Sequence, residues 1–163
     1  MSSALAASAA EINRDASAAL AKLYDKVPEA RTLSANAKGI LIFPSIVKAG
    51  FIFGAQYGEG VMRRQGKNAG YYNTVSASYG LQAGVQSFGY VLFFMTDSAL
   101  AYLNKSDGFE IGVGPSIVVL DAGKAKTLTT TTGQSDIYAF IFDQKGLMAG
   151  LGIQGSKISR MDK

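Results

Sequence analysis

The chain has 163 residues and a formal net charge of +4, and it contains no histidine and no cysteine. The missing residue types exclude most zinc, iron and copper sites, Ser–His triads, cysteine nucleophiles and disulfides. Hydrophobic residues make up 48% of the chain and charged residues 17%, which indicates one folded domain with its own core. The positive charge favours anionic partners but is too small to indicate nucleic-acid binding.

The first segment of the chain is alanine-rich and has the periodicity of a helix. Pro28 ends or kinks this helix, and residues 29–37 are predicted to form a second one, so the helical region covers residues 1–37. Two interpretations of its apolar stripe are open: it packs on the core, or it lies on a membrane surface. No apolar run is long enough to span a bilayer, and the first residues lack a signal-peptide pattern. The stripe consists of Ile12, Ala16, Ala19, Leu20, Leu23 and Val27.

Residues 38–163 have the pattern of a β-rich core. Residues 51–58 and 75–86 alternate between apolar and small or polar residues, as in half-buried strands of an antiparallel sheet. Three shorter runs are continuously apolar and predict strands that are covered on both faces: 40–43, 90–95 and 137–142.

Two further elements complete the predicted domain. Residues 96–108 predict a short capped helix near 97–104, and residues 114–133 predict a hairpin that turns near 121–123. We therefore expect a single domain over residues 1–163, of the α+β class. In it, N-terminal helices pack on a twisted, barrel-like antiparallel β-sheet.

Two short motifs match catalytic or nucleotide-binding signatures, but their contexts argue against those functions. Residues 150–155, "GLGIQG", match G-x-G-x-x-G, yet only eight residues follow, too few for the rest of a dinucleotide site. Alternation instead predicts a strand over residues 147–154. Residues 45–48, "SIVK", match S-x-x-K without its companion motifs, and Pro44 indicates a loop there. No pair of carboxylates stands out either, so we expect no enzyme, no metal site and no cofactor.

Glycine and glutamine share one face of several predicted strands. A strand without side chains lets another backbone or a ligand approach closely. Two explanations are open: a helix packed tightly on this face or strong coiling of the sheet, or a polar groove that is open to water or a ligand. The pattern covers Gly54, Gln56 and Gly58, then Gly80, Gln82, Gly84 and Gln86, then Gly150, Gly152 and Gln154.

Six basic residues are candidates for an anion-binding surface. Arginine offers two parallel donors to a phosphate group, and lysine adds a compact positive charge. Near an anionic membrane each cation contributes about 1 kcal/mol, so the set matters only if its members converge in space. Otherwise they are ordinary solvated charges. The candidates are Arg63, Arg64 and Lys67 in a predicted hairpin turn, Lys48 in a second loop, and Lys157 and Arg160 in the C-terminal segment.

Three segments together carry a resemblance to a known family. Residues 37–64 contain A-K-G-I followed by a proline, then K-A-G-F and G-x-G. Residues 70–100 contain G-x-Q-x-G, and residues 143–160 contain K-G-L and a late glycine. In combination, over roughly residues 30–160, these motifs resemble the SYLF domain family. The resemblance implies binding of membrane lipids, notably phosphoinositides, and in some eukaryotic members binding of actin filaments.

The residues that make up these motifs are similar to those of the bacterial branch of the family. Residues 70–73, "GYYN", stand where many eukaryotic members carry a tryptophan. Bacterial relatives look like exported lipoproteins that are tethered through a lipidated N-terminal cysteine. We therefore expect a protein of the bacterial envelope, in the periplasm or at the outer membrane. It would be lipid-anchored in its full-length form and soluble as this chain, a setting that argues against actin as a partner.

The expected function is non-enzymatic binding of anionic, phosphoinositide-type headgroups by the six cations named above, without nucleic acid as a partner. The alternative is a structural or partner-binding envelope module, in which the glycine and glutamine face or an edge strand docks another protein. Salt dependence discriminates between the two, because headgroup binding weakens steeply with ionic strength and apolar docking does so much less.

Overall fold

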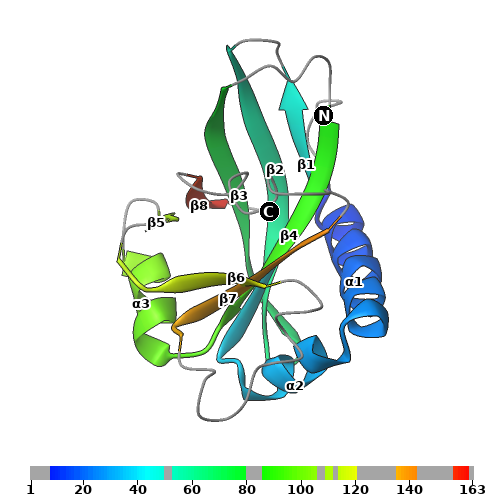
Figure 1. Cartoon of the computed structure of the whole chain (residues 1–163), viewed down its shortest axis with the longest axis vertical. Coiled ribbons are helices and arrows are strands. Elements are labelled where there is room, and N and C mark those ends of the chain that lie inside the picture. Colours follow the sequence, from blue (N-terminus) through cyan, green and yellow to red (C-terminus); the bar gives the residue numbers. More distant parts are fainter. Residues whose placement is uncertain are drawn as a thin grey trace.

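A computed structural model describes residues 8–49, 53–79, 86–105, 109–111, 114–120, 135–142 and 156–161. Two helices come first, and a third helix follows the fourth strand of a single curled sheet (Figure 1). This is the predicted α+β architecture. The helices are α1 (Ala9–Lys26), α2 (Pro28–Asn36) and α3 (Asp97–Lys105). The strands are β1 (Gly39–Ala49), β2 (Phe53–Arg64), β3 (Lys67–Tyr79), β4 (Gln86–Phe94), β5 (Phe109–Glu110), β6 (Ile117–Leu120), β7 (Ile137–Phe142) and β8 (Lys157–Met161).

Helix α1 begins after the capping residue Ser8 and ends at Lys26, two residues before Pro28. The Ser8 hydroxyl accepts a hydrogen bond from the backbone N–H of Glu11 at 3.2 Å. Pro28 then occupies the start of α2, where its missing N–H removes no helical hydrogen bond. The apolar stripe of α1 is buried against the sheet, which confirms the first of the two interpretations of this stripe. Its buried members within the helix are Ile12, Ala16, Leu20 and Leu23.

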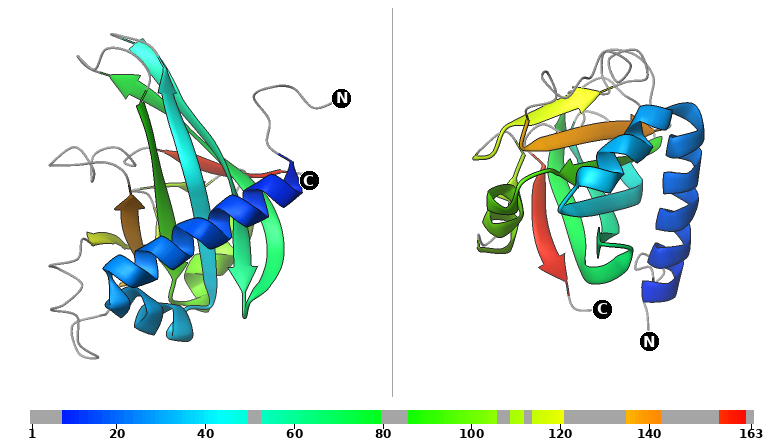
Figure 2. Two further views of the ribbon diagram at one scale, coloured as in Figure 1. Left: turned by 90° about the vertical axis from the view of Figure 1, so that its right-hand side faces the viewer. Right: turned by 90° about the horizontal axis from the view of Figure 1, so that it is seen from below.

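The sheet has the strand order β5-β8-β3-β2-β1-β4-β7-β6 and curls into a half-barrel. The pairs are antiparallel, as predicted, except that β6 and β7 run parallel. Helix α1 lies along one side of the sheet and α3 along the other (Figure 2). We call these sides the α1 face and the α3 face.

Each face of the sheet has its own hydrophobic core. Ile42, Val91 and Phe93 belong to the core under α1, whereas their chain neighbours Leu41 and Leu92 belong to the core under α3. Consecutive strand residues point to opposite faces, so a strand that is covered on both sides must be apolar at every position. This confirms the prediction for the three continuously apolar runs, whose described side chains are mostly buried.

Strand β1 contains a bulge, and glycines on β2 make room for it. The pairing register of β1 with β4 shifts between Phe43 and Ile46. A β-carbon at Gly58 would lie 2.6 Å from Cγ1 of Ile46, and one at Gly60 would collide with the carbonyl oxygen of Ile42. These two glycines therefore make room for the bulge of β1. Gly58 belongs to the predicted glycine pattern, and the group that approaches it closely is the neighbouring strand.

The structure corrects two sequence predictions in this part of the chain. Pro44 and Lys48 lie in strand β1, not in a loop, because the bulge accommodates the proline within the strand. The single strand predicted over residues 75–86 is wrong. Tyr79 pairs with β2 and Gln86 pairs with β1, so the two residues occupy strands that lie apart in the sheet.

The remaining predictions have mixed outcomes. Helix α3 confirms the predicted short helix, and the Thr96 hydroxyl caps it by accepting from the backbone N–H of Ala99 at 3.1 Å. The predicted turn near 121–123 and the predicted strand over 147–154 lie outside the described residues. No helix in the described part of the chain is both long and apolar enough to span a membrane.

Candidate functional site

Two of the six predicted cations flank the turn of the β2–β3 hairpin. Its two-residue turn consists of Gln65 and Gly66, with φ angles of 54° and 78°. Both angles lie in the left-handed region, as in the turns that best match the twist of antiparallel strands. Arg64 and Lys67 flank this turn as a cross-strand pair, and both are exposed. The predicted hairpin at this place is confirmed.

Alternation along β2 and β3 places Arg64 and Lys67 on the α3 face. Met62, two residues before Arg64, is buried in the α3-face core, and Ala69, two residues after Lys67, packs against the same core. Residues two apart in a strand point to the same side. The side chains of Arg64 and Lys67 therefore both point to the α3 face of the sheet.

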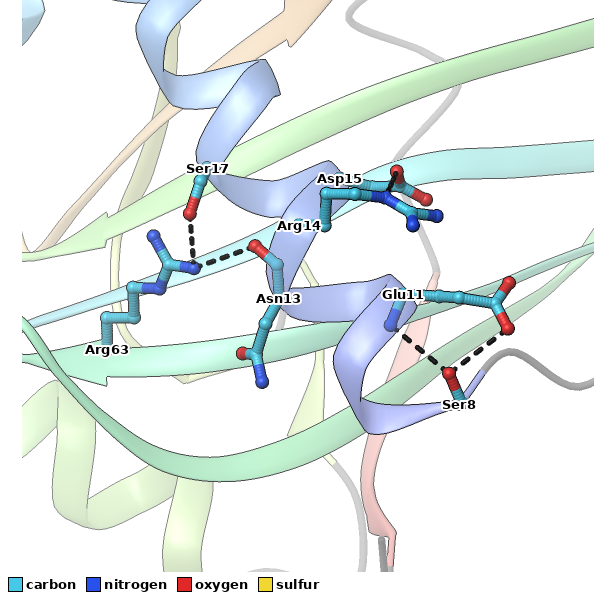
Figure 3. A network of polar contacts seen from close by, with 7 residues as sticks. All are labelled: Ser8, Glu11, Asn13, Arg14, Asp15, Ser17 and Arg63. Atoms are coloured by element: carbon cyan, nitrogen blue, oxygen red, sulfur yellow. Dashed lines mark hydrogen bonds and ion pairs between the residues drawn. The ribbon is translucent and has the colours of Figure 1, made fainter.

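Arg63 points the other way and binds helix α1. Its guanidinium donates to the backbone carbonyl oxygen of Asn13 at 3.0 Å and to the Ser17 hydroxyl at 2.8 Å (Figure 3). The Asn13 side-chain amide in turn donates to the Tyr71 hydroxyl at 2.8 Å. Arg63 thus joins α1 to the sheet through two hydrogen bonds from Nη2.

Replacing Arg63 by alanine is expected to destabilise the docked helix. The substitution removes two hydrogen bonds from a charged donor, and because the side chain is half-exposed we expect a loss of about 1–2 kcal/mol. Chemical denaturation measures the loss, and hydrogen exchange should rise in α1. Arg64→Ala is the control, because its side chain leaves the opposite face. Equal stability of the two variants would contradict the role of Arg63.

Arg160 on β8 lies against β3. It pairs with Tyr72, and its guanidinium carbon is 5.9 Å from the centroid of the Tyr72 ring. Ile158, two residues before Arg160 on the same strand, is buried in the α3-face core, which places Arg160 on the α3 face as well. Gly70, which the guanidinium overlies, is three residues from Lys67, a span of about 10 Å along a strand. Burial raises the pKa of Tyr72, and the positive charge of Arg160 opposes that rise.

The two remaining candidates, Lys157 and Lys48, lie apart from Arg64, Lys67 and Arg160. Lys157 precedes the buried Ile158 and therefore points to the α1 face, with Glu110 of β5 as its cross-strand partner. Lys48 pairs with Gln56 near the far end of β1, about 25 Å along the strand from the partner of Arg63. The side chain of Lys48 lies outside the described part of the structure.

The structure thus brings together Arg64, Lys67 and Arg160 on one face and separates the other three candidates from them. We call these three residues the cationic group. Sequence reasoning missed Gly70 and Tyr72, which contact Arg160, because the pairing of β8 with β3 joins residues almost ninety positions apart. Within the described residues, no cluster of three or more acidic side chains could hold a metal ion.

Comparison with known proteins supplies the family. A family model described as "Las17-binding protein actin regulator", Ysc84, matches residues 75–163, which is more than half of the chain. The match includes β4, α3 and β8, the strand that carries Arg160. A search of curated proteins found no match. The Ysc84 family is associated with binding lipids or actin-regulating partners. The chain therefore belongs to the Ysc84 family of SYLF domains, as its motifs predicted, and is a binding domain of that lipid- or actin-regulator-related kind.

Proposed function

We propose that this domain binds anionic lipid headgroups at a membrane surface through the cationic group, and that it does so without catalysing a reaction. One observation carries the proposal: Arg64, Lys67 and Arg160 are all exposed and all leave the same face of the sheet. Arg63, the neighbour of Arg64, is occupied by helix α1 and is left out of the proposed site.

The electrostatics of three cations are sufficient for weak, reversible binding. Each basic residue near an anionic surface contributes about 1 kcal/mol, so three contribute roughly 3 kcal/mol, or about a hundredfold in affinity. The interaction is between exposed groups, and salt therefore screens it over a Debye length of about 10 Å at 0.1 M. Binding of this strength suits a domain that a second attachment, such as a lipid tether, also holds near the membrane.

The finer parts of the proposal rest on the family. Phosphoinositide-type headgroups are the preferred ligands that the resemblance implies. A bacterial envelope lipoprotein, tethered by a lipidated cysteine ahead of this domain, is the setting that its motifs favour. In that setting the partner is a lipid rather than actin, although the family description names an actin regulator.

Sedimentation with lipid vesicles tests the proposal. The chain should sediment with vesicles that contain phosphatidylserine or a phosphatidylinositol phosphate, and not with neutral phosphatidylcholine vesicles. The double variant Arg64→Glu/Lys67→Glu should lose this binding by roughly thirtyfold or more, because two contributions of about 1 kcal/mol are removed and then reversed in sign.

A matched control separates the site from net charge. The double variant Lys22→Glu/Lys26→Glu changes the net charge equally, at exposed positions of α1. It should keep most of the vesicle binding. If both double variants bind equally, or if the wild type ignores anionic vesicles, the proposed site or the proposed function is wrong.

One observation favours the alternative of a partner-binding module. Tyr57 and Val75 are cross-strand partners on neighbouring strands, and they are 41% and 44% exposed. Two large apolar side chains side by side can contribute to a small protein-docking surface. Binding that persists at high salt and fails in Tyr57→Ser would favour this module over headgroup binding.

A further inference from the structure

Arg160 differs from an ordinary surface arginine because the structure holds its guanidinium in place. A free arginine side chain loses conformational freedom when it binds a ligand, and this loss opposes binding. The Arg160 guanidinium instead lies near the ring of Tyr72, at 5.9 Å from guanidinium carbon to ring centroid, and next to the backbone of Gly70. The Arg160 side chain has therefore lost part of its conformational freedom before any ligand binds.

Gly70 provides the space for this guanidinium. A β-carbon at position 70 would lie 3.2 Å from Nη2 of Arg160 and 3.3 Å from its Cζ. The φ of Gly70 is +133°, a backbone conformation that other residues rarely adopt. A side chain at this position would force the guanidinium to shift by a few tenths of an ångström.

The ring of Tyr72 contacts the guanidinium, and its own orientation is set by packing and a hydrogen bond. The ring is buried, and its hydroxyl donates to the side-chain oxygen of Asn104 on α3 at 2.7 Å. Because Asn104 belongs to α3, the helix and the sheet together set the orientation of the ring. Arg160 is thus positioned by residues of β3 and α3 that are rigidly packed.

We propose that Arg160 is the residue of the cationic group that recognises a phosphomonoester, and that Gly70 and Tyr72 are positioning residues for its guanidinium. This inference rests on the proposed headgroup binding. A planar guanidinium matches two oxygens of a phosphate group, whereas a lysine ammonium is a point charge without that geometry. Lys67 and Arg64 lie toward the hairpin, about 10 Å away, and attract anionic lipids without this selectivity.

Vesicles of two compositions and equal surface charge test the inference. One composition contains phosphatidylserine, and the other contains a phosphatidylinositol monophosphate. The wild type should prefer the second. Arg160→Lys keeps the charge and should keep binding to phosphatidylserine, but it should lose roughly tenfold in preference, the effect of about one charge-assisted hydrogen bond.

Gly70→Ala tests the positioning role, and Gly66→Ala is its matched control. Both glycines have positive φ, but a β-carbon at Gly66 meets nothing within 4 Å. Gly70→Ala should reduce the preference in part, because the guanidinium is shifted rather than removed, and Gly66→Ala should keep it. Thermal unfolding verifies that each variant is folded, and Arg160→Lys tests the proposal even if Gly70→Ala does not fold.

The outcomes distinguish this inference from the proposed function. A wild type that binds no anionic vesicle overturns both. A wild type that binds both vesicles equally, or an Arg160→Lys variant that keeps the preference, overturns the inference alone. Inorganic phosphate supplies the second arm: if it shifts the NMR signal of the Arg160 side-chain N–H without vesicles, Arg160 recognises a phosphate group that is free in solution as well as one on a lipid.

Discussion

Replacing Gly60 by alanine is expected to destabilise the domain by about 3 kcal/mol, the upper range for forcing extra volume into a packed interior. The added methyl group would meet the carbonyl oxygen of Ile42 and lie 2.7 Å from the ring of Phe43. Both residues are fully buried on β1, just before the bulge, so neither can move without disturbing the strand. Urea denaturation at constant pH measures the loss.

The control for this prediction is again Gly66→Ala in the exposed hairpin turn. Its added methyl group has open space around it, and only the left-handed backbone conformation opposes it, at about 1 kcal/mol. If the two alanine variants are equally stable, the close approach of β1 to Gly60 does not limit the fold.

Replacing Phe93 by alanine is expected to cost about 3–5 kcal/mol, as for large-to-small changes of buried aromatic residues. Phe93 is fully buried in the α1-face core, and its ring meets that of Phe140 on β7 edge to face, with centroids 5.7 Å apart. The substitution leaves a cavity between the sheet and α1, because rigidly paired strands cannot close it.

Denaturation with urea measures this loss, and Val118→Ala on β6 provides the comparison. Val118 is 41% exposed, so its truncation should change the free energy of unfolding by less than about 0.5 kcal/mol. Hydrogen exchange adds a regional readout, since α1 should open more readily in Phe93→Ala. A loss below about 1 kcal/mol would contradict the assignment of Phe93 to the core.

These stability predictions bear on function through helix α1. The helix is held by its apolar stripe and by the hydrogen bonds from Arg63. Because Arg63 and Arg64 are adjacent in β2, one contacts the helix while the other faces solvent on the opposite side. A triple reversal of Arg63, Arg64 and Lys67 would therefore mix loss of binding with loss of helix docking, and the double variant avoids this.

Much of the fold could be predicted from local pattern. The stripe of α1, the cap of α3 and the continuously apolar strands follow from periodicity and capping, which act over a few residues. The end of β3 could not be predicted in this way, because the alternation continues through residues 75–86 although Tyr79 and Gln86 lie in different strands. Nor could the placement of Pro44 in a strand, since only its partner strands reveal the bulge.

The sequence by itself determined the residue types that could act: it contains no histidine and no cysteine, and it offers sixteen lysines and arginines. It placed Arg63 and Arg64 together in a hairpin turn, and only their position in β2 makes the two side chains face opposite sides of the sheet. Only the tertiary structure decided which side each faces, because that depends on where α1 docks. It alone joined Arg160 to Gly70 and Tyr72, since pairing between strands distant in sequence depends on the packing of the whole sheet and not on local propensity.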